Sequence, residues 1–344
     1  MRSLPTPTHQ SLYKNLHRNL VVGTETGDDA AVWCLDNGQK DGLEDAQGAP
    51  CVVSTADFFA PVVDDPHTWG RIAAANAVSD IYAMGGTPLF GLNLVAWPQT
   101  KLPLDLLTDV LAGGAAVAEK GGWAIAGGHT INGPEPLYGQ AITGQVDPAK
   151  ILTNSGGQPG QWLVLTKPIG TGLVATAIKQ SEPEACKPNG SLAESYRAAV
   201  TEMTRLNDKA AATALEVQAT AATDITGFGL LGHLQKMAEA SQTGAVIQAE
   251  QVPVLTGAWE LLDQGFIAGG STRNLQHIQA HIQGCPDQRV LTMLTDAQTS
   301  GGLLFSCDPS AATEAVARLQ AQDHTAAIIG ELTAQRPAKL TITQ

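Results

Sequence analysis

The feature that most constrains the fold is a polar, glycine-rich stretch, TNSGGQPG, at residues 153–160. This composition is typical of a connecting segment. Strand-like apolar runs and alanine-rich helical runs occur on both sides of it, which predicts an α+β fold of the mixed α/β kind. We therefore expect two domains, over residues 1–152 and 161–344. This division agrees with a typical size of roughly 150 residues per domain.

The first half is expected to alternate strands with long helices. An alanine-rich helix should follow Pro66, which suits a first helical turn, and should stop at the glycine pair at 85–86. A second helix over Leu104–Lys120 contains Gly113 and Gly114, which we expect to weaken it. Strand-like runs lie at Cys51–Phe59, Leu89–Trp97, Trp123–Ala126 and Tyr138–Val146.

The second half repeats the mixture with shorter strands. Helical segments are expected at Leu173–Gln180, from Leu192 to Gln218, inside GFGLLGHLQKMAEA and at Pro309–Gln320. Strand-like runs are WLVLTK, which starts at Trp162, then GLLFSC at 302–307, and AAIIGEL and KLTIT near the end.

Charge and composition exclude several classes of protein. With 20 Lys and Arg against 33 Asp and Glu, the net charge is −13, which argues against a nucleic-acid or membrane-surface partner. The 5 cysteines form no CxxC pair, so we expect neither a disulfide framework nor a zinc site. The first twenty residues lack the apolar core of a secretory signal, and no apolar run approaches the ~18 residues of a membrane span. These features predict a cytoplasmic protein.

Chemistry is expected from aspartates that lie at the edges of apolar segments, with small residues beside them. The chain has no GxxxxGKS/T loop, HExxH, GxSxG or Rossmann glycine fingerprint after a strand. Carboxylates of this kind suit Mg²⁺, which prefers a few carboxylates together with phosphate oxygens and water. The aspartates are Asp28 and Asp29 in GDDAAVW, Asp57 in STADFF, Asp80 in NAVSDIYAMGG and Asp224 in TDITGFG.

Each of these residues also has a purely structural interpretation. The pair before Ala30 could be a turn at a strand start, Asp57 a salt-bridged strand end, and Asp224 the N-cap of a helix. Asn76 and Asp80, spaced i, i+4, share one helix face that could be solvated, although few charges lie near it.

Three glycine-containing segments could approach a phosphate. They are GGHTINGPEP at 127–136, TDITGFGLLGHL at 223–234 and TSGGLLFS at 299–306. Paired glycines allow close backbone approach and positive φ, but ordinary turns use them as well. Together with the aspartates, these segments predict nucleotide binding through carboxylate-held Mg²⁺.

The motifs together resemble one family. ETGDDAAV, the long block from Ser54 to Leu89, AGGHTINGPEPLYGQAITG, TDITGFGLLGHL and DAQTSGGLL, in this order, are similar to selenophosphate synthetases (selenide, water dikinases). The resemblance runs from about Asn19 to about Leu332. More distantly, the chain is similar to the aminoimidazole-ribonucleotide synthetase superfamily, which includes thiamine-monophosphate kinases.

The resemblance implies a fold, a reaction and partners. An N-terminal domain pairs with its twin to form a homodimer with a shared barrel-like sheet, and an α+β domain follows. ATP and Mg²⁺ lie in the cleft between the two domains. ATP, selenide and water become AMP, phosphate and selenophosphate, the selenium donor for selenocysteine and selenouridine.

The resemblance also implies site residues. It assigns metal ligands to Asp29, Asp80 and Asp224. It assigns nucleotide contacts to Thr26, Gly27, Asp28, Asp57, Asn76, Asp80, Gly128, His129 and Thr130.

The chain departs from the family pattern at one point. The family's glycine-rich loop, with its Cys or selenocysteine nucleophile and a Lys, is expected upstream of Met1, because no Cys precedes Cys34. We expect an upstream in-frame UGA that encodes selenocysteine, and a chain that, as written, binds ATP but turns over poorly. The alternatives are a sister kinase acting on a small metabolite and a non-catalytic ATP-binding paralogue.

Overall fold

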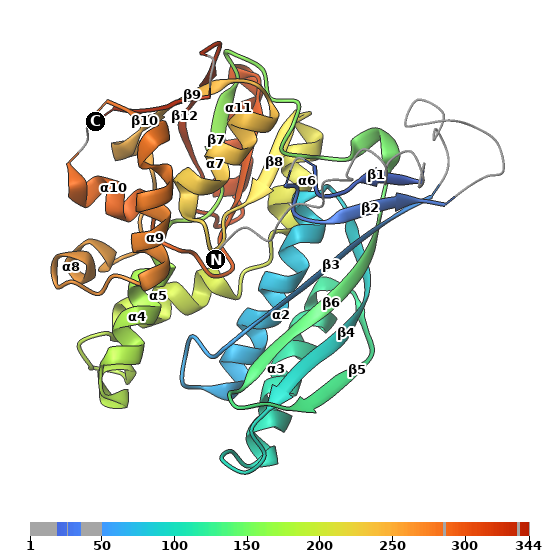
Figure 1. Ribbon diagram of the computed structural model, residues 1–344, viewed down its shortest axis with the longest axis vertical. Coiled ribbons are helices and arrows are strands. Elements are labelled where there is room, and N and C mark those ends of the chain that lie inside the picture. Colours follow the sequence, from blue (N-terminus) through green and yellow to red (C-terminus); the bar gives the residue numbers. More distant parts are fainter. Residues whose placement is uncertain (1–18, 26, 36–49, 285–286, 336–337, 344) are drawn as a thin grey trace.

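The strands separate into two sheets at the glycine-rich stretch (Figure 1). The computed structural model describes residues 19–25, 27–35, 50–284, 287–335 and 338–343. The first sheet has the strand order β1-β2-β3-β6-β4-β5, and the second has the order β10-β13-β9-β12-β7-β11-β8. The mixed α+β class is therefore confirmed, and the domain limits at 152 and 161 stay a prediction.

The first sheet is mostly antiparallel, and only β4 and β5 run parallel among its described strands. Helices α2 and α3 pack against each other, and α2 also contacts β3, β4 and β6. The elements of this half are β1 (Leu20–Val22), β2 (Ala31–Cys34), β3 (Cys51–Phe59), α2 (Pro66–Ala83), β4 (Thr87–Trp97), α3 (Leu104–Gly121), β5 (Ala124–Asn132) and β6 (Leu137–Val146).

Helix α2 begins and ends as the sequence predicts. The side chain of Asp65 accepts a hydrogen bond from the Thr68 amide at 2.7 Å, and Pro66 occupies the first turn. Gly85, at φ 74°, lies in the left-handed region just after the helix ends.

The glycines that were expected to weaken α3 do not interrupt it. The helix runs unbroken through Gly113 and Gly114, because both glycines let neighbours come close. A methyl group on Gly113 would overlap the carbonyl oxygen of His67 in α2, and one on Gly114 would overlap the hydroxyl of Tyr138. The local loss in helix propensity is thus offset by tight packing of α2 on α3.

The second sheet has helices on both faces. Leu163 and Leu165 of β7 face the hydrophobic cluster that contains α4 and α7, and Val164 faces the one that contains α6 and α11. Strands and helices of this half are β7 (Trp162–Leu165), α4 (Thr171–Gln180), α5 (Ala193–Met203), α6 (Asp208–Glu216), β8 (Ala221–Asp224), α7 (Gly229–Ala240), β9 (Gly244–Gln248), α8 (Ala258–Asp263), α9 (Gly269–Ile278), β10 (Ile282–Gln283), α10 (Gln288–Leu294), β11 (Leu303–Cys307), α11 (Pro309–Gln320), β12 (Ala327–Thr333) and β13 (Leu340–Thr343).

Two sequence expectations need correction here. The helical stretch from Leu192 to Gln218 is divided into α5 and α6, because the segment between them turns at Asn207. The Asn207 side chain is buried and donates to the carbonyl of Gly301 at 2.9 Å. The strand predicted over Trp123–Ala126 continues as β5 to Asn132, so the glycine pair at 127–128 lies in a strand and not in a loop.

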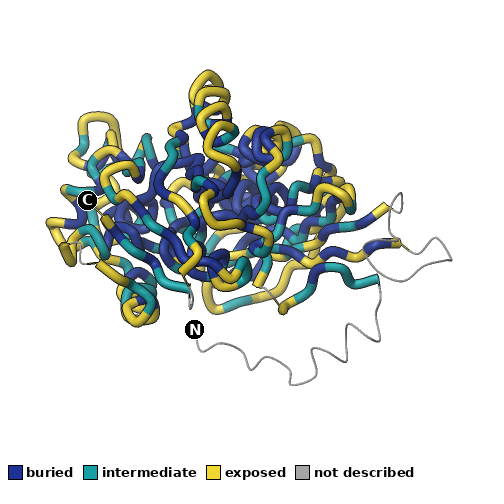
Figure 2. The backbone as a smooth tube through the Cα atoms, turned by 90° about the horizontal axis from the view of Figure 1, so that it is seen from above, coloured by how far each residue is buried: buried dark blue, intermediate teal, exposed yellow. Residues whose placement is uncertain are grey.

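The two halves share their cores. Each of the two hydrophobic clusters contains residues from both halves, such as Ile72 with Leu163 in one and Ile81 with Phe305 in the other. Buried segments run through the middle of the molecule (Figure 2). Helix α2, which belongs to the first half, contacts β8, α5 and α6 of the second. This contact brings the residues of α2 next to the end of β8.

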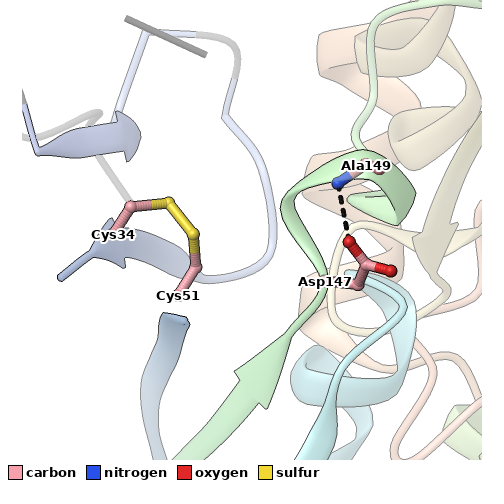
Figure 3. Close-up of a disulfide and its surroundings, with 4 residues drawn as sticks. All are labelled: Cys34, Cys51, Asp147 and Ala149. Atoms are coloured by element: carbon pink, nitrogen blue, oxygen red, sulfur yellow. Dashed lines mark hydrogen bonds between the residues drawn. A yellow bond between two sulfur atoms is a disulfide. The ribbon is translucent and has the colours of Figure 1, made fainter. Parts of the chain in front are cut away.

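One pair of cysteines contradicts the sequence expectation. Cys34 and Cys51 form a disulfide between β2 and β3 (Figure 3). They lie 17 residues apart in sequence but are direct partners in the antiparallel register, with Cα atoms 3.9 Å apart. Sequence spacing does not reveal such a cross-strand pair, and Cys285 lies outside the described residues.

Among the described helices, none has the length and apolar character needed to cross a membrane.

Candidate active site

Three aspartates from distant parts of the chain converge. Asp29 precedes β2, Asp80 lies in α2 and Asp224 is the last residue of β8. One carboxylate oxygen of each lies within 4.8 Å of the others. The three metal ligands that the resemblance implies therefore form one cluster, which we call the aspartate triad.

Burial and mutual repulsion disfavour the charged form of all three. Burial raises the pKa of Asp29 well above its ordinary value, and the charge of Asp224 raises it further. The pKa of Asp80 is raised in the same way by burial and then by Asp224 and Asp29. Burial raises the pKa of Asp224 to about 6. Three carboxylates this close need a cation to be ionised together at neutral pH.

The triad fits a divalent cation that prefers oxygen ligands. Oδ2 of Asp29 and Oδ2 of Asp224 are buried, and no hydrogen-bond partner contacts either atom among the described residues. A buried carboxylate oxygen that lacks a partner is costly. A hard cation such as Mg²⁺ would satisfy both oxygens, and the donor set contains no sulfur or nitrogen ligand that would favour a softer metal.

Hydroxyl groups orient two of the triad carboxylates. Thr55 of β3 donates to Asp80, and Thr223 donates to Oδ1 of Asp29 at 2.9 Å. Behind Thr223 lies His233, whose Nε2 accepts from the amide of Thr226 at 3.2 Å. Burial lowers the pKa of His233 to about 3, so this ring is neutral and serves as a support.

Asp57 and Asn76 form a second polar group beside the triad. The Asn76 amide donates to Asp57, and its Oδ1 accepts from the backbone amide of Ser300 at 2.9 Å. Burial raises the pKa of Asp57, and the charge of Asp57 in turn raises the pKa of Asp80 and of Asp224. Asn76 is buried, so the solvated helix face that was the structural alternative for Asn76 and Asp80 is wrong.

Gly27 and Asp28, two further nucleotide contacts that the resemblance implies, directly precede Asp29 in the chain and are held by Asn154. Oδ1 of Asp28 accepts from the backbone amide of Asn154 at 2.7 Å, and the carbonyl of Gly27 accepts from the Asn154 side chain at 3.0 Å. These bonds tie the segment before β2 to the connection between the halves. Thr26 lies outside the described residues.

Gly128, His129 and Thr130 are not brought to the triad within this chain. They lie in β5, the exposed edge strand of the first sheet. Gly128 shares a row with Asp57 across β3, β6, β4 and β5, three strand spacings away. At ~4.8 Å per spacing this is roughly 14 Å. Their contact with a nucleotide stays a prediction.

The N-cap alternative for Asp224 is also wrong. The residue ends β8, and α7 begins only at Gly229, whose φ of 71° is in the left-handed region.

Phe228, 49% exposed, precedes that helix, and the ammonium of Lys236 lies 4.1 Å from its ring centroid. The expected loop-to-helix junction is therefore present beside the triad.

Sequence reasoning missed most of the supporting residues. Thr55 lies on the same face of β3 as the core residues Cys51 and Val53, and Thr223 lies in a strand that is buried throughout. Neither threonine carries a motif signal by itself. His233 could have been noticed, because a histidine on the apolar side of a helix next to a metal motif is a common support for ligands. Ser300 acts through its backbone amide, and the identity of a residue does not indicate what its backbone amide contacts.

Comparisons with known proteins identify the family of this chain. The AIR synthase related protein N-terminal domain family matches residues 27–146, and the C-terminal domain family of that name matches residues 158–343. The selenide, water dikinase of Myxococcus xanthus is 43% identical over 320 residues, which are 92% of this chain and 86% of that protein. That of Bordetella bronchiseptica is 43% identical over 324 residues, 94% of this chain and 88% of that protein.

The chain belongs to the selenide, water dikinase family. Solved structures of more distant proteins share the fold of this chain. Thiamine-monophosphate kinase from Stenotrophomonas maltophilia K279a matches with a TM-score of 0.66 at 20% identity, covering 96% of this chain and 93% of that chain. Hydrogenase maturation protein HypE in complex with ATP matches with a TM-score of 0.61 at 19% identity, covering 94% and 84%.

Proposed function

We propose that this chain is a selenide, water dikinase that converts ATP, selenide and water to selenophosphate, AMP and phosphate. The observation that carries the proposal is the convergence of Asp29, Asp80 and Asp224 within 4.8 Å, in a chain that is 43% identical to a protein of that name. In the reaction two P–O bonds of the triphosphate break. One phosphorus gains a bond to selenium, and the other gains a bond to a water oxygen.

We further propose that the aspartate triad holds Mg²⁺. The unsatisfied oxygens of Asp29 and Asp224 and the all-oxygen donor set support this assignment. When bound, Mg²⁺ neutralises charge on the phosphate oxygens, which is the main requirement of phosphoryl transfer.

The residues of this chain orient the carboxylates that would hold the metal and the triphosphate. Thr55 and Thr223 hold the carboxylates of Asp80 and Asp29 in fixed orientations. Asp57, oriented by Asn76, adds a carboxylate beside the triad that can accept a hydrogen bond or bind a further cation. Because these groups come from both halves, the triphosphate is expected to lie where the halves meet. Such preorganised geometry lowers the barrier to transfer without covalent participation.

The products of the reaction test this proposal. Anaerobic assays with ATP, Mg²⁺ and selenide, followed by ³¹P NMR, are expected to show AMP and selenophosphate in equal amounts. ADP together with a phosphorylated metabolite would favour a sister kinase. The assay is run on the chain and on a form extended by the codons upstream of Met1. Nucleotide binding without turnover in both forms would favour a non-catalytic paralogue.

A homodimer is part of the proposal. The face of the first sheet that points away from α2 and α3 carries exposed apolar side chains, which we call the outer sheet face. Alternation along the strands and the register across them place these side chains on one side of the sheet. An exposed apolar patch of this kind typically marks an interface, here with a second copy of the chain. Its large members are Trp33, Phe58, Phe90, Leu92 and Ile131.

A charge on the outer sheet face should separate the protomers. Leu92→Lys, at a residue 39% exposed, is expected to convert a dimer into a monomer in sedimentation analysis, because the ammonium would be buried without a partner. Leu104→Lys is the control, since Leu104 is 57% exposed at the start of α3, outside this face. A Leu92→Lys protein that sediments like the wild type would argue against this interface.

A cytoplasmic location also belongs to the proposal, since selenide requires reducing conditions. Under such conditions the Cys34–Cys51 pair is expected to be reduced.

A further inference from the structure

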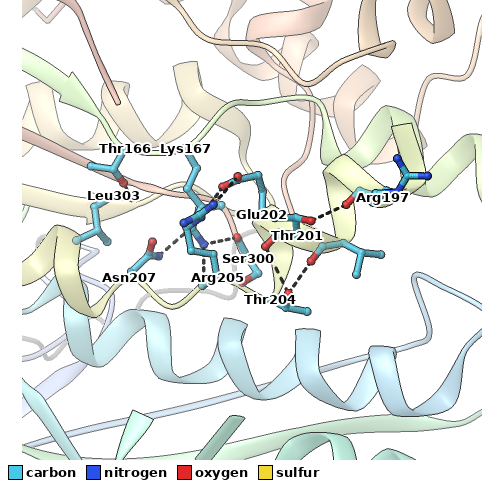
Figure 4. Close-up of polar contacts among 12 residues, drawn as sticks. Thr166, Lys167, Arg197, Thr201, Glu202, Thr204, Arg205, Asn207, Ser300 and Leu303 are labelled. Atoms are coloured by element: carbon cyan, nitrogen blue, oxygen red, sulfur yellow. Dashed lines mark hydrogen bonds and ion pairs between the residues drawn. The ribbon is translucent and has the colours of Figure 1, made fainter. Parts of the chain in front are cut away.

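Lys167 is a buried lysine whose role the proposed reaction does not explain. It lies two residues after β7, and its side chain is 1% exposed. Its Nζ donates to two backbone carbonyls, that of Arg205 at 2.7 Å and that of Ser300 at 3.0 Å (Figure 4). An ammonium is buried at this depth only where it has such acceptors.

Charged groups surround this lysine without forming a direct ion pair with it among the described residues. Glu202 pairs instead with Arg205, at 3.1 Å between Oε2 and Nε. Burial lowers the pKa of Lys167 to about 7, the charges of Glu202, Asp224 and Asp208 raise it, and that of Arg205 lowers it. Charged or neutral, the amino group has N–H donors for the two backbone carbonyls, as expected for a residue that fixes the path of the chain.

The segment that Lys167 holds has an unfavourable conformation. Ser300 lies at φ 50°, in the left-handed region that residues with a side chain seldom adopt. A methyl group on the following Gly301 would overlap the carbonyl of Ile225, so the segment is pressed against the chain just after β8. A conformation of this kind persists only where surrounding contacts hold it in place. Lys167 supplies one of these contacts at the Ser300 carbonyl.

The same segment orients Asn76. The Ser300 amide donates to Oδ1 of Asn76, which leaves the Asn76 Nδ2 group facing Asp57. Without the Ser300 amide, either end of the Asn76 side chain could face the carboxylate, and an oxygen in that place would repel it. Lys167, Ser300, Asn76 and Asp57 thus form a continuous series of hydrogen bonds across the two halves.

We propose that Lys167 is a positioning residue for the nucleotide site: its amino group holds the Ser300 carbonyl, which fixes Asn76 and through it Asp57. The role of Asp57 in binding ATP rests on the function proposed above. The contact between Lys167 and Ser300 does not, so the two can be tested separately.

The first test measures the segment itself. In hydrogen–deuterium exchange, Lys167→Met is expected to raise the exchange rate of the peptide that contains Ser300 by about tenfold, since its amide bond to Asn76 opens more often. Asn76→Ala should have a similar effect, because it removes the acceptor. Lys209→Met, at an exposed lysine of α6, is the matched control and should leave this peptide unchanged.

The second test measures binding of a non-hydrolysable ATP analogue with Mg²⁺. Lys167→Met and Asn76→Ala should each weaken analogue binding by about tenfold, and the double variant should be no weaker than either, because both act through one series of contacts. Binding of Mg²⁺ alone should not weaken in Lys167→Met, whereas general damage to the fold would lower both affinities.

The outcomes of these tests separate the role of Lys167 from the proposed function. Unchanged exchange at the Ser300 peptide in Lys167→Met would overturn the proposal, and so would additive losses in the double variant. If Lys167→Met does not fold, Lys167→Gln, which keeps one donor group on a shorter side chain, replaces it with the same expected direction. A wild-type protein that binds no nucleotide would overturn the proposed function, and the exchange measurement would still decide whether Lys167 holds the segment.

Discussion

In the form extended upstream of Met1, Asp224→Asn should lower ATP-dependent turnover by about a thousandfold, equivalent to roughly 4 kcal/mol of transition-state stabilisation. It should also raise the melting temperature of the metal-free protein. The two effects have one cause. Asp224 lies within 4.8 Å of Asp29 and Asp80, and the charges repel one another unless a cation lies between them. The amide removes one of these charges and also one ligand for Mg²⁺.

The sign of the stability change follows from the pKa values. Burial raises the pKa of Asp224 to about 6 in the folded protein. A carboxyl with a raised pKa binds its proton more tightly in the folded than in the unfolded chain, so stability falls as pH rises from about 4 towards the folded value. At pH 7.5 the full cost is present, and the amide relieves it.

Calorimetry and steady-state kinetics at pH 7.5 measure both effects. Asp263→Asn is the control: this aspartate pairs with Arg289 on the surface, at 2.6 Å, and its replacement should change neither quantity appreciably. A metal-free Asp224→Asn protein that melts below the wild type would contradict the inferred repulsion among the three carboxylates.

The affinity of the wild-type protein for Mg²⁺ should fall by at least about tenfold between pH 7.5 and pH 5, because protons compete with the metal for the same oxygens. Asp224, with a pKa raised to about 6 by burial, is mostly protonated at pH 5. Asp29 and Asp80, whose pKa values burial also raises, add to the loss.

Titration calorimetry with Mg²⁺ alone across this pH range measures the dependence. Asp224→Asn should show a weaker affinity at every pH and a shallower dependence, since one competing proton is gone. An affinity that is constant from pH 5 to pH 7.5 would show that the metal binds elsewhere.

The sequence predicted those parts of the fold that local chemistry determines. Pro66 and the glycine pair at 85–86 marked the ends of α2, and the helix at Pro309–Gln320 was predicted with the limits that the structure shows. The aspartates of the triad were recognisable as candidates because each lies at the edge of an apolar segment beside small residues, although each also had a structural interpretation. Their convergence was predicted through the resemblance to a family rather than through spacing.

The remainder depends on contacts between distant residues. Nothing local distinguishes Gly113 as a packing glycine from a helix breaker, because its partner is His67 in another helix. The disulfide between Cys34 and Cys51 depends on the register of two strands. Ser300 acts through a backbone amide, and β5 extends through a glycine pair because β4 pairs with it.

The position of α2 limits how a chain of this kind can evolve. This helix carries Asn76 and Asp80, packs on the first sheet and also contacts β8, α5 and α6. Neither half can therefore be exchanged for a foreign module, or expressed as an autonomous unit, without exposing apolar surface and dividing the carboxylates between two fragments. The glycine-rich stretch joins the two halves, and we expect them to evolve together as a single unit.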